Sequence, residues 1–167
     1  MIEEKFQAVV LGAGESGVGA ALLYQSRGIS VMVSDYGHIA PKYKQELEAN
    51  GIPYEEGSHT TELILIVKSP GIPEKAPIMV AIRERGIPVI SEIELAGRYL
   101  KGKVIGITGS NGKTTTTMWL HHILTEAGMK PALAGNVGFS LARQVIPYEQ
   151  PDYFVVELSS FQLDDMY

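Results

Sequence analysis

The stretch KVIGITGSNGKTTTT, residues 103–117, decides the architecture of the second half of this 167-residue chain. A β-branched run at 104–107 leads into a glycine-rich loop, and an apolar-periodic segment follows Lys113 and four consecutive threonines. Strand, glycine loop and helix in this order form a cradle for phosphate, because loop amides and a helix N-terminus both attract anions. The plainer alternative is a tight turn whose glycines only avoid steric clashes. Lysine and threonine directly after the last glycine favour phosphate binding.

The candidate phosphate-binding residues are Gly109, Ser110, Asn111, Gly112, Lys113, Thr114 and Thr115. We expect Lys113 to reach the outer phosphates and to take part in catalysis, and the Thr114 hydroxyl to bind Mg²⁺. The common form of this pattern has a glycine where the chain has Ile107, so the loop is a variant. The helix that follows is predicted to place Trp119 in the core.

A carboxylate downstream of the loop is the second candidate in this half. The strand predicted at 153–156 runs into Glu157, which therefore lies at the carboxyl end of a buried strand. Phosphoryl-transfer sites with a glycine loop use an acid in this position to hold Mg²⁺. The alternative is an acid that caps the next helix or faces solvent. We predict that Glu157 is a metal ligand and a catalytic residue.

The first half contains another glycine turn, within residues 6–35. A buried strand precedes GAGESG at 12–17, and a helix and a second strand that ends in Asp35 follow it. This context is typical of a Rossmann-like unit whose first turn holds a pyrophosphate or a ribose. Taken alone it fits a dinucleotide equally, and its structural alternative is close helix–strand packing through Gly17 and Gly19.

A strand predicted at 63–67 leads into Ser69-Pro70-Gly71, at the position where open α/β sheets bind ligands. A plain turn explains this stretch about as well. Ser91 and Glu94 fit a helix cap, and we place the domain boundary near them. The predicted fold class is α/β, with a Rossmann-like parallel-sheet domain at 1–93 and part of a P-loop ATPase-type α/β domain at 94–167.

Composition limits the classes of function. The formal net charge is −5 and no basic run occurs, so nothing suggests a nucleic-acid surface. The absence of cysteine excludes disulfides and Cys-ligated metals. No N-terminal apolar region typical of a signal peptide and no run of about 18 apolar residues is present, so we expect neither a signal peptide nor a membrane span. A cytoplasmic protein is the default expectation.

Five motifs together resemble those of the Mur ligases, which build peptidoglycan precursors in the bacterial cytoplasm. The loop at 106–114 is similar to the ATP loop of that family, and ELSSFQL at 157–163 resembles its D-glutamate-adding members. The other three motifs are GAGESG at 12–17, SPGI at 69–72 and GNVG at 135–138.

The resemblance implies a reaction and its ligands. ATP, bound with Mg²⁺, phosphorylates the carboxylate of UDP-MurNAc-L-alanine, and the amine of D-glutamate then attacks the acyl phosphate to form an amide. No nucleic-acid partner is implied, and the full-length enzyme is expected to be a monomer.

The resemblance also assigns residues. Gly14, Glu15, Ser16, Asp35 and Tyr36 occupy positions where the family holds the uridine diphosphate, and Ser69, Pro70 and Gly71 line the same site. Asn136, Ser159 and Gln162 are expected to face the muramoyl portion. The family often has a basic residue shortly after the acid of the second strand, where this chain reads Tyr36-Gly37-His38.

Family members have three domains, so the resemblance implies that these 167 residues are an N-terminal fragment that does not catalyse ligation alone. Unpaired edges of its second sheet are expected to favour self-association. Two other functions remain open: an NAD(P)-dependent oxidoreductase, favoured by the turn at 12–17 and Asp35, and a non-catalytic nucleotide-binding module. An oxidoreductase has no use for the sequence at 112–114.

Overall fold

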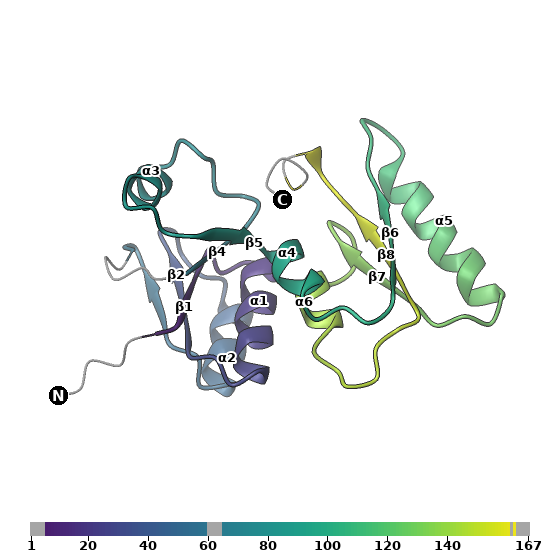
Figure 1. Ribbon diagram of the computed structural model, residues 1–167, viewed down its shortest axis with the longest axis horizontal. Coiled ribbons are helices and arrows are strands. Elements are labelled where there is room, and N and C mark those ends of the chain that lie inside the picture. The colour runs from purple at the N-terminus through teal and green to yellow at the C-terminus, as the bar shows by residue number, and fades with distance from the viewer. Residues whose placement is uncertain (1–5, 60–64, 161, 163–167) are drawn as a thin grey trace.

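Two separate parallel sheets make up the structure, a computed structural model that describes residues 6–59, 65–160 and 162. Figure 1 shows the sheets side by side, with helices packed between them. Among the described residues, no helix combines the length and apolar character needed to cross a bilayer. The α/β class predicted from the sequence is confirmed.

The first sheet has the strand order β3-β2-β1-β4-β5, and every neighbouring pair is parallel. Its strands are β1 (Ala8–Leu11), β2 (Val31–Asp35), β3 (Tyr54–Glu56), β4 (Ile66–Lys68) and β5 (Val89–Ser91). The chain leaves β1 toward β2 on one side and returns to β4 on the other. The gap between the ends of β1 and β4 is therefore a topological switch point, where open α/β sheets bind ligands.

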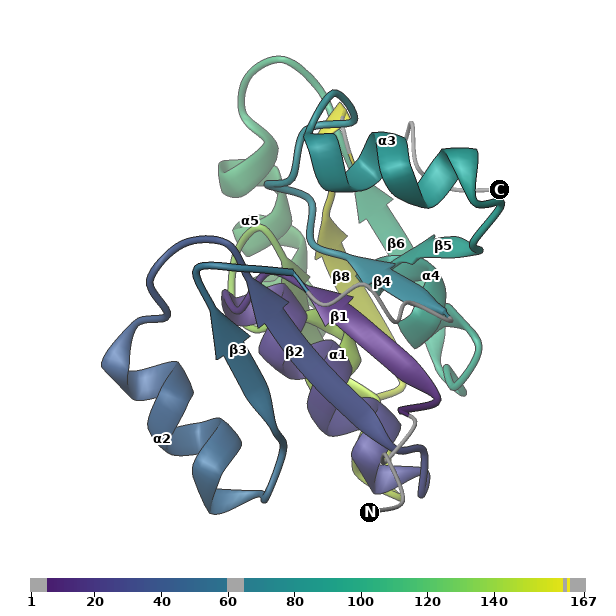
Figure 2. The same cartoon turned by 90° about the vertical axis from the view of Figure 1, so that its left-hand side faces the viewer.

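Four helices accompany this sheet: α1 (Glu15–Ser26), α2 (Pro41–Ala49), α3 (Pro77–Glu84) and α4 (Glu92–Gly97). Alternate strand residues face opposite sides. Val9 and Leu11 pack against one cluster that includes Met79 of α3, whereas Val10 belongs to the cluster around α1. Figure 2 shows α1 behind the five strands. Both faces of β1 are covered, which explains its uninterrupted apolar sequence.

The second sheet has the order β6-β8-β7 and is also parallel. It consists of β6 (Lys103–Ile107), β7 (Pro131–Gly135) and β8 (Tyr153–Glu157), with helices α5 (Lys113–Glu126) and α6 (Leu141–Gln144). Helix α5 packs on β7 and β8, and α6 packs on α1 and α4. The central strand β8 brings its carboxyl end beside the loop that begins α5.

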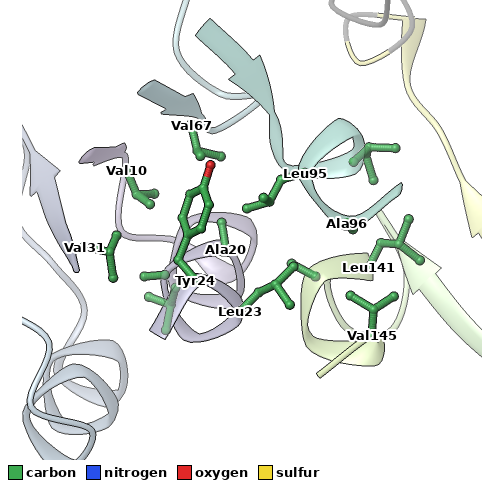
Figure 3. Packing of buried hydrophobic residues seen from close by; sticks show 14 of the residues in the cluster. Val10, Ala20, Leu23, Tyr24, Val31, Val67, Leu95, Ala96, Leu141 and Val145 are labelled. Carbon is green, nitrogen blue, oxygen red and sulfur yellow. The ribbon is translucent and has the colours of Figure 1, made fainter. Parts of the chain in front are cut away.

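One hydrophobic cluster spans the space between the two sheets. Figure 3 shows Tyr24 of α1 between Val10 and Val67 of the first sheet on one side and the residues of α4 and α6 on the other. The same cluster includes Leu141 of α6 and Phe154 of β8. The two sheets are thus packed on a common core rather than tethered by a loop.

One expectation about local structure needs correction, and one strand was missed. Trp119 was predicted to be buried but is 71% exposed. The face of α5 that meets the sheet follows Thr117, Leu120 and Leu124, spaced by three and four residues, and Trp119 lies off that stripe. Strand β3 was not predicted, because its sequence YEE lacks an apolar pattern.

Ser91 caps α4 as predicted, since its hydroxyl accepts a hydrogen bond from the Glu94 amide at 3.1 Å. Residues 60–64 lie outside the described part of the chain, so the strand expected at 63–67 is seen only from Ile66 onward.

Candidate nucleotide-binding sites

A cavity of about 900 Å³ lies at the switch point of the first sheet. Its walls come from the turn after β1, the end of β2, and the loop between β4 and α3. The structure brings together around it all eight residues predicted for the UDP portion: Gly14, Glu15, Ser16, Asp35, Tyr36, Ser69, Pro70 and Gly71. Seven further residues line the cavity: Gly12, His59, Ile72, Pro73, Ala76, Pro77 and Ile78. That the eight bind substrate remains a prediction.

The glycine turn holds the N-terminus of α1 against this cavity. Gly12 has φ +89°, a left-handed conformation that glycine adopts without strain. A side chain at Gly17 would place its Cβ 1.8 Å from the Gly12 carbonyl oxygen, so only glycine fits there. No side chain caps α1 at Gly14. The first amides of α1 can therefore donate hydrogen bonds to an anion.

Asp35 fixes the shape of this turn. Its Oδ2 accepts a hydrogen bond from the Ala13 amide at 2.7 Å, and its Oδ1 accepts one from the Gly37 amide at 2.8 Å. Both oxygens of the carboxylate therefore tie together the two loops that border the cavity. In dinucleotide-binding units an acid in this position accepts a hydrogen bond from a ribose, and in this structure it accepts hydrogen bonds from two backbone amides.

Glu15 connects the cavity to the second sheet. Its Oε1 accepts hydrogen bonds from the Ser140 amide at 3.1 Å and from Nε of Arg143 at 2.8 Å. The other guanidinium nitrogens of Arg143 donate to both carboxylate oxygens of Glu46 on α2. These hydrogen bonds lower the pKa of Glu46 and raise the pKa of Arg143. One arginine of α6 thus joins α1 and α2 of the first sheet.

Sequence analysis missed Arg143, since its partners lie 97 and 128 residues away along the chain and no local pattern marks them. We expect Arg143→Ala to lower the free energy of unfolding by about 2 kcal/mol, because it leaves two partly buried carboxylates without their cation. Urea unfolding measures this loss. Arg83→Ala is the matched control, since Arg83 is mostly exposed and pairs with Glu74 at the surface, and it should cost less than about 0.5 kcal/mol.

The loss should also depend on pH. The folded protein lowers the pKa of Glu46, so the stabilisation from Arg143 is present above the ordinary carboxyl value near 4.5 and disappears as the pH falls through the lowered value. A difference between the wild type and Arg143→Ala that stays constant from pH 7 to pH 3 would contradict this assignment.

The second glycine loop, 108–112, is open to solvent at the start of α5. Gly112 is the N-cap of α5 with φ +76°, and no side chain caps it. Lys113 donates a hydrogen bond from Nζ to the Gly109 carbonyl at 2.7 Å, so its ammonium folds back over the loop. Thr114 and Thr115 are exposed. Loop amides, an uncapped helix end and a lysine over the loop are the groups that a phosphate chain requires.

Glu157 lies beside this loop, as the last residue of β8. It pairs in register with Ile107, the end of β6, and with Gly135, the end of β7. The side chain is 5% exposed, and its Oε2 has no hydrogen-bond partner among the described residues. A buried carboxylate oxygen without a partner is costly unless a cation or donor binds it.

The donors in this part of the structure fit Mg²⁺ rather than a metal held by protein alone. Among residues 6–59, 65–160 and 162, no group of three or more His, Asp or Glu could hold a metal ion. Mg²⁺ commonly takes one or two protein oxygens and completes its shell with phosphate oxygens and water. Glu157 with the Thr114 hydroxyl matches that requirement.

The three residues predicted for the muramoyl portion lie just beyond β7 and β8. Asn136 is exposed, and its backbone amide donates to the Glu157 carbonyl at 3.1 Å. Gln162 is buried, and its Oε1 accepts a hydrogen bond from the Ser159 backbone amide at 2.8 Å. The backbone amide of Gln162 donates to Ser159 Oγ at 3.3 Å. This reciprocal pair is a capping box, which the spacing Ser-x-x-Gln could have revealed. Contact with a ligand remains a prediction for all three.

Comparison with known protein families gives two successive matches along the chain. The description of the MurD-like N-terminal domain of Mur ligases matches residues 6–91, just over half of the chain. This chain belongs to the Mur ligase family. The middle domain of Mur ligases matches residues 107–167, which contain the second glycine loop and Glu157.

Two curated relatives of this Mur ligase chain share one description. A UDP-N-acetylmuramoylalanine–D-glutamate ligase of Porphyromonas gingivalis is 63% identical over 167 residues, which is 98% of this chain and 37% of that protein. The ligase of the same description from Bacteroides fragilis is 58% identical over 95% of this chain and 36% of its own length. The chain thus spans somewhat more than a third of the length of these relatives.

Solved Mur ligase structures share the fold. A UDP-N-acetylmuramate:L-alanyl-gamma-D-glutamyl-meso-diaminopimelate ligase from Neisseria meningitides has a TM-score of 0.60 and 27% identity, over 91% of this chain and 52% of that one. A UDP-N-acetylmuramate-alanine ligase from Thermotoga maritima has a TM-score of 0.56 over 92% of this chain and 37% of that one. At 23% identity, the second likeness concerns the fold alone.

Proposed function

We propose that this chain binds UDP-MurNAc-L-alanine through the cavity of the first sheet and ATP with Mg²⁺ at the loop 108–115. It would do so as part of a ligase that joins D-glutamate to the muramoyl-alanine carboxylate. The observation that carries the proposal is the presence of two separate glycine turns, one per sheet, each before a helix N-terminus without a side-chain cap, on a common core. The descriptions of the curated relatives support the choice of substrates.

In the first cavity, the chain's own groups are suited to a diphosphate. The amides at the start of α1 offer hydrogen bonds and the positive end of the helix dipole. Glu15 lines the same cavity and would repel an anion, but Arg143 and the Ser140 amide already bind its carboxylate. Arg143 thereby reduces the repulsion that a substrate phosphate would meet.

At the second loop, Lys113 would leave the Gly109 carbonyl and bind the outer phosphates, while Thr114 and Glu157 would hold Mg²⁺. When bound, Mg²⁺ offsets the charge that develops on the transferred phosphoryl group. The carboxylate of the UDP substrate accepts that phosphoryl group, and the amine of D-glutamate then displaces phosphate to form the amide. A ligase that consumes ATP works where ATP is available, so we propose the cytoplasm as its compartment. We also propose that the full-length form is a monomer.

One observation disfavours an NAD(P)-dependent oxidoreductase. The buried oxygen of Glu157 and the loop beside it have no role in hydride transfer. A non-catalytic nucleotide-binding module would share both sites and differ only in chemistry.

Calorimetric titration with UDP-MurNAc-L-alanine, with NAD⁺ as the comparison ligand, tests this function. We expect saturable binding of the UDP compound alone. Gly71→Leu should weaken that binding at least tenfold, because a new side chain intrudes on the cavity that Gly71 lines. Gly97→Leu is the matched control, since a Cβ at either glycine would have no atom within 4 Å and Gly97 lies on α4, outside the cavity lining.

Binding of NAD⁺ in place of the UDP compound would overturn the proposal. D-glutamate-dependent release of ADP by the 167-residue polypeptide would contradict the narrower expectation that ligation needs residues outside this chain.

A further inference from the structure

Helix α6 brings the second sheet into contact with the wall of the first cavity. Glu15, which lines that cavity, accepts hydrogen bonds from the Ser140 amide at 3.1 Å and from Nε of Arg143 at 2.8 Å. The two helices also touch directly, because a Cβ at Gly19 of α1 would lie 2.0 Å from Ser140 Oγ and 3.1 Å from Cγ of Arg143. Figure 1 shows α6 between the two sheets, next to α1. The contact between α1 and α6 therefore sets where the second sheet stands relative to the cavity.

A hydrogen-bonded loop connects α6 to the carboxyl ends of β7 and β8. The Gly135 amide donates to the Phe139 carbonyl at 3.1 Å, which closes the loop before α6 begins. The Asn136 backbone amide donates to the Glu157 carbonyl at 3.1 Å, which ties the same loop to the end of β8. These hydrogen bonds link the position of α6 to that of Glu157, the acid beside the second glycine loop.

Arg143 provides the directional part of the contact between the sheets. Its side chain is 18% exposed, and its two terminal nitrogens donate to the two carboxylate oxygens of Glu46 on α2. The apolar cluster between the sheets holds them together, but burial of apolar surface has no preferred direction. A guanidinium paired with carboxylates constrains both distance and angle. Arg143, bound to α1 and α2 at once, thus fixes how α6 is oriented on the first sheet.

Two further hydrogen bonds hold the backbone of α6. The Ala142 amide donates to Oε1 of Glu92 at 2.5 Å, and Arg27 at the end of α1 donates to the Val145 carbonyl at 3.0 Å. Neither reaches the cavity lining. They remain when Arg143 is replaced, so we expect α6 to stay attached but to lose its fixed orientation.

We propose that Arg143 is a positioning residue, which fixes the second sheet relative to the first cavity so that one ligand can extend from that cavity to Glu157. This inference rests on the proposed function, in which a single substrate has its diphosphate at the first turn and its reacting carboxylate near the second. The covalent structure of such a ligand limits its span, so both ends bind well only when the two sheets keep one distance. Misplacement by about 1 Å is sufficient to cost about a hundredfold in rate.

Distances between labels on the two sheets test the positioning directly. The chain has no cysteine, so Ala81→Cys on α3 and Glu126→Cys on α5 introduce two unique, exposed sites for spin labels. We expect one narrow distance distribution in the labelled protein and one about twice as wide in Arg143→Met, which keeps the aliphatic stem but not the guanidinium. Arg98→Met is the matched control and should keep the narrow distribution, because Arg98 pairs with Glu94 in the same segment.

A calorimetric comparison of two ligands tests the consequence for binding. UDP-N-acetylglucosamine has the diphosphate and the sugar ring of UDP-MurNAc-L-alanine but lacks its lactoyl-alanine arm, which ends in the reacting carboxylate. Both ligands meet the same charges at the first turn, so the ratio of their affinities reports on the arm alone. We expect the arm to strengthen binding about tenfold in the wild type and in Arg98→Met, and less than about twofold in Arg143→Met.

The outcomes separate this inference from the proposed function. A distance distribution of unchanged width in folded Arg143→Met, equal affinity of the wild type for the two ligands, or a tenfold ratio retained in Arg143→Met would each overturn the inference alone. Failure of UDP-MurNAc-L-alanine to bind the wild type would overturn the proposed function and, with it, the role of Arg143 in placing a ligand. The label distances would then still decide whether Arg143 fixes the two sheets. Circular dichroism of each variant confirms that the comparison is made between folded proteins.

Discussion

Gly17→Ala is expected to lower the free energy of unfolding by about 4 kcal/mol and to abolish nucleotide binding in the first cavity. The added methyl would lie 1.8 Å from the Gly12 carbonyl oxygen and 3.0 Å from Ser69 Oγ. The Gly12 carbonyl cannot move cheaply, because it belongs to the backbone and the Gly12 amide donates to the Ser34 carbonyl. Relief requires α1 to shift away from β1, and that shift opens the turn that forms the cavity wall.

Gly14→Ala is the matched control, because it adds the same methyl group to the same turn without the clash. Gly14 has φ −84°, which any residue adopts, and a Cβ there would have no atom within 4 Å. Its expected change in unfolding free energy is below about 1 kcal/mol. Equal stability of the two variants in urea unfolding would show that the contact between Gly12 and Gly17 does not determine the position of α1.

Glu92→Gln is expected to reduce the loss of stability as the pH rises. Between pH 4.5 and pH 8, the free energy of unfolding should fall by about 3 kcal/mol less than in the wild type. Glu92 is 2% exposed at the start of α4, and its Oε1 accepts from the Ala142 amide at 2.5 Å. Burial raises the pKa of Glu92 to about 7, and the nearby Glu15 acts in the same direction. The hydrogen bond from Ala142 only partly offsets the cost of burying the charge.

The direction follows from the two protonation states. Below about pH 4.5, Glu92 is neutral in both the folded and the unfolded chain, so it adds no dependence on pH. Between 4.5 and 7, the unfolded chain loses this proton while the folded chain keeps it, and the free energy of unfolding falls as the pH rises. Glutamine has no such proton, so its difference from the wild type grows over this interval and is constant above it.

Urea unfolding of both proteins at several pH values measures this difference. Glu94→Gln is the matched control on the same helix, because its carboxylate forms an i, i+4 pair with Arg98 and should contribute no more than about 0.5 kcal/mol at any pH. A difference between the wild type and Glu92→Gln that does not change from pH 4.5 to pH 8 would show that Glu92 remains ionised in the folded protein. The buried position between α4 and α6 would then need another charge to compensate it.

Local spacing was sufficient to find most of the candidate site. The turn at 12–17 needs glycine where a carbonyl approaches α1, and the loop at 108–112 needs glycine at the start of α5. These requirements concern residues within one turn of the chain, so a local sequence pattern predicts them. The position of Glu157 at the end of a strand was also predictable, since it is a single acid that directly follows an apolar run.

Residue spacing did not predict the buried face of α5, because apolar residues lie on several faces of this helix. Met118 and Trp119 are adjacent in α5 and point in different directions, so both cannot lie on the stripe that meets the sheet. Both are in fact exposed. The pattern alone could not decide which of the apolar residues face β7 and β8, because that depends on how the helix is rotated over the sheet.

The sequence by itself determined the two α/β units and the positions of both glycine turns, since each follows from short-range backbone geometry. The resemblance to the Mur ligases placed eight of the residues that line the first cavity. Only the tertiary structure decided what joins and tunes these parts. Arg143 meets Glu15 across 128 residues, and His59 lines the cavity beside Ser34 of β2, 25 residues away. Charge pairing and side-chain contacts depend on distances in space, and side chains distant in sequence acquire those distances only when the chain folds.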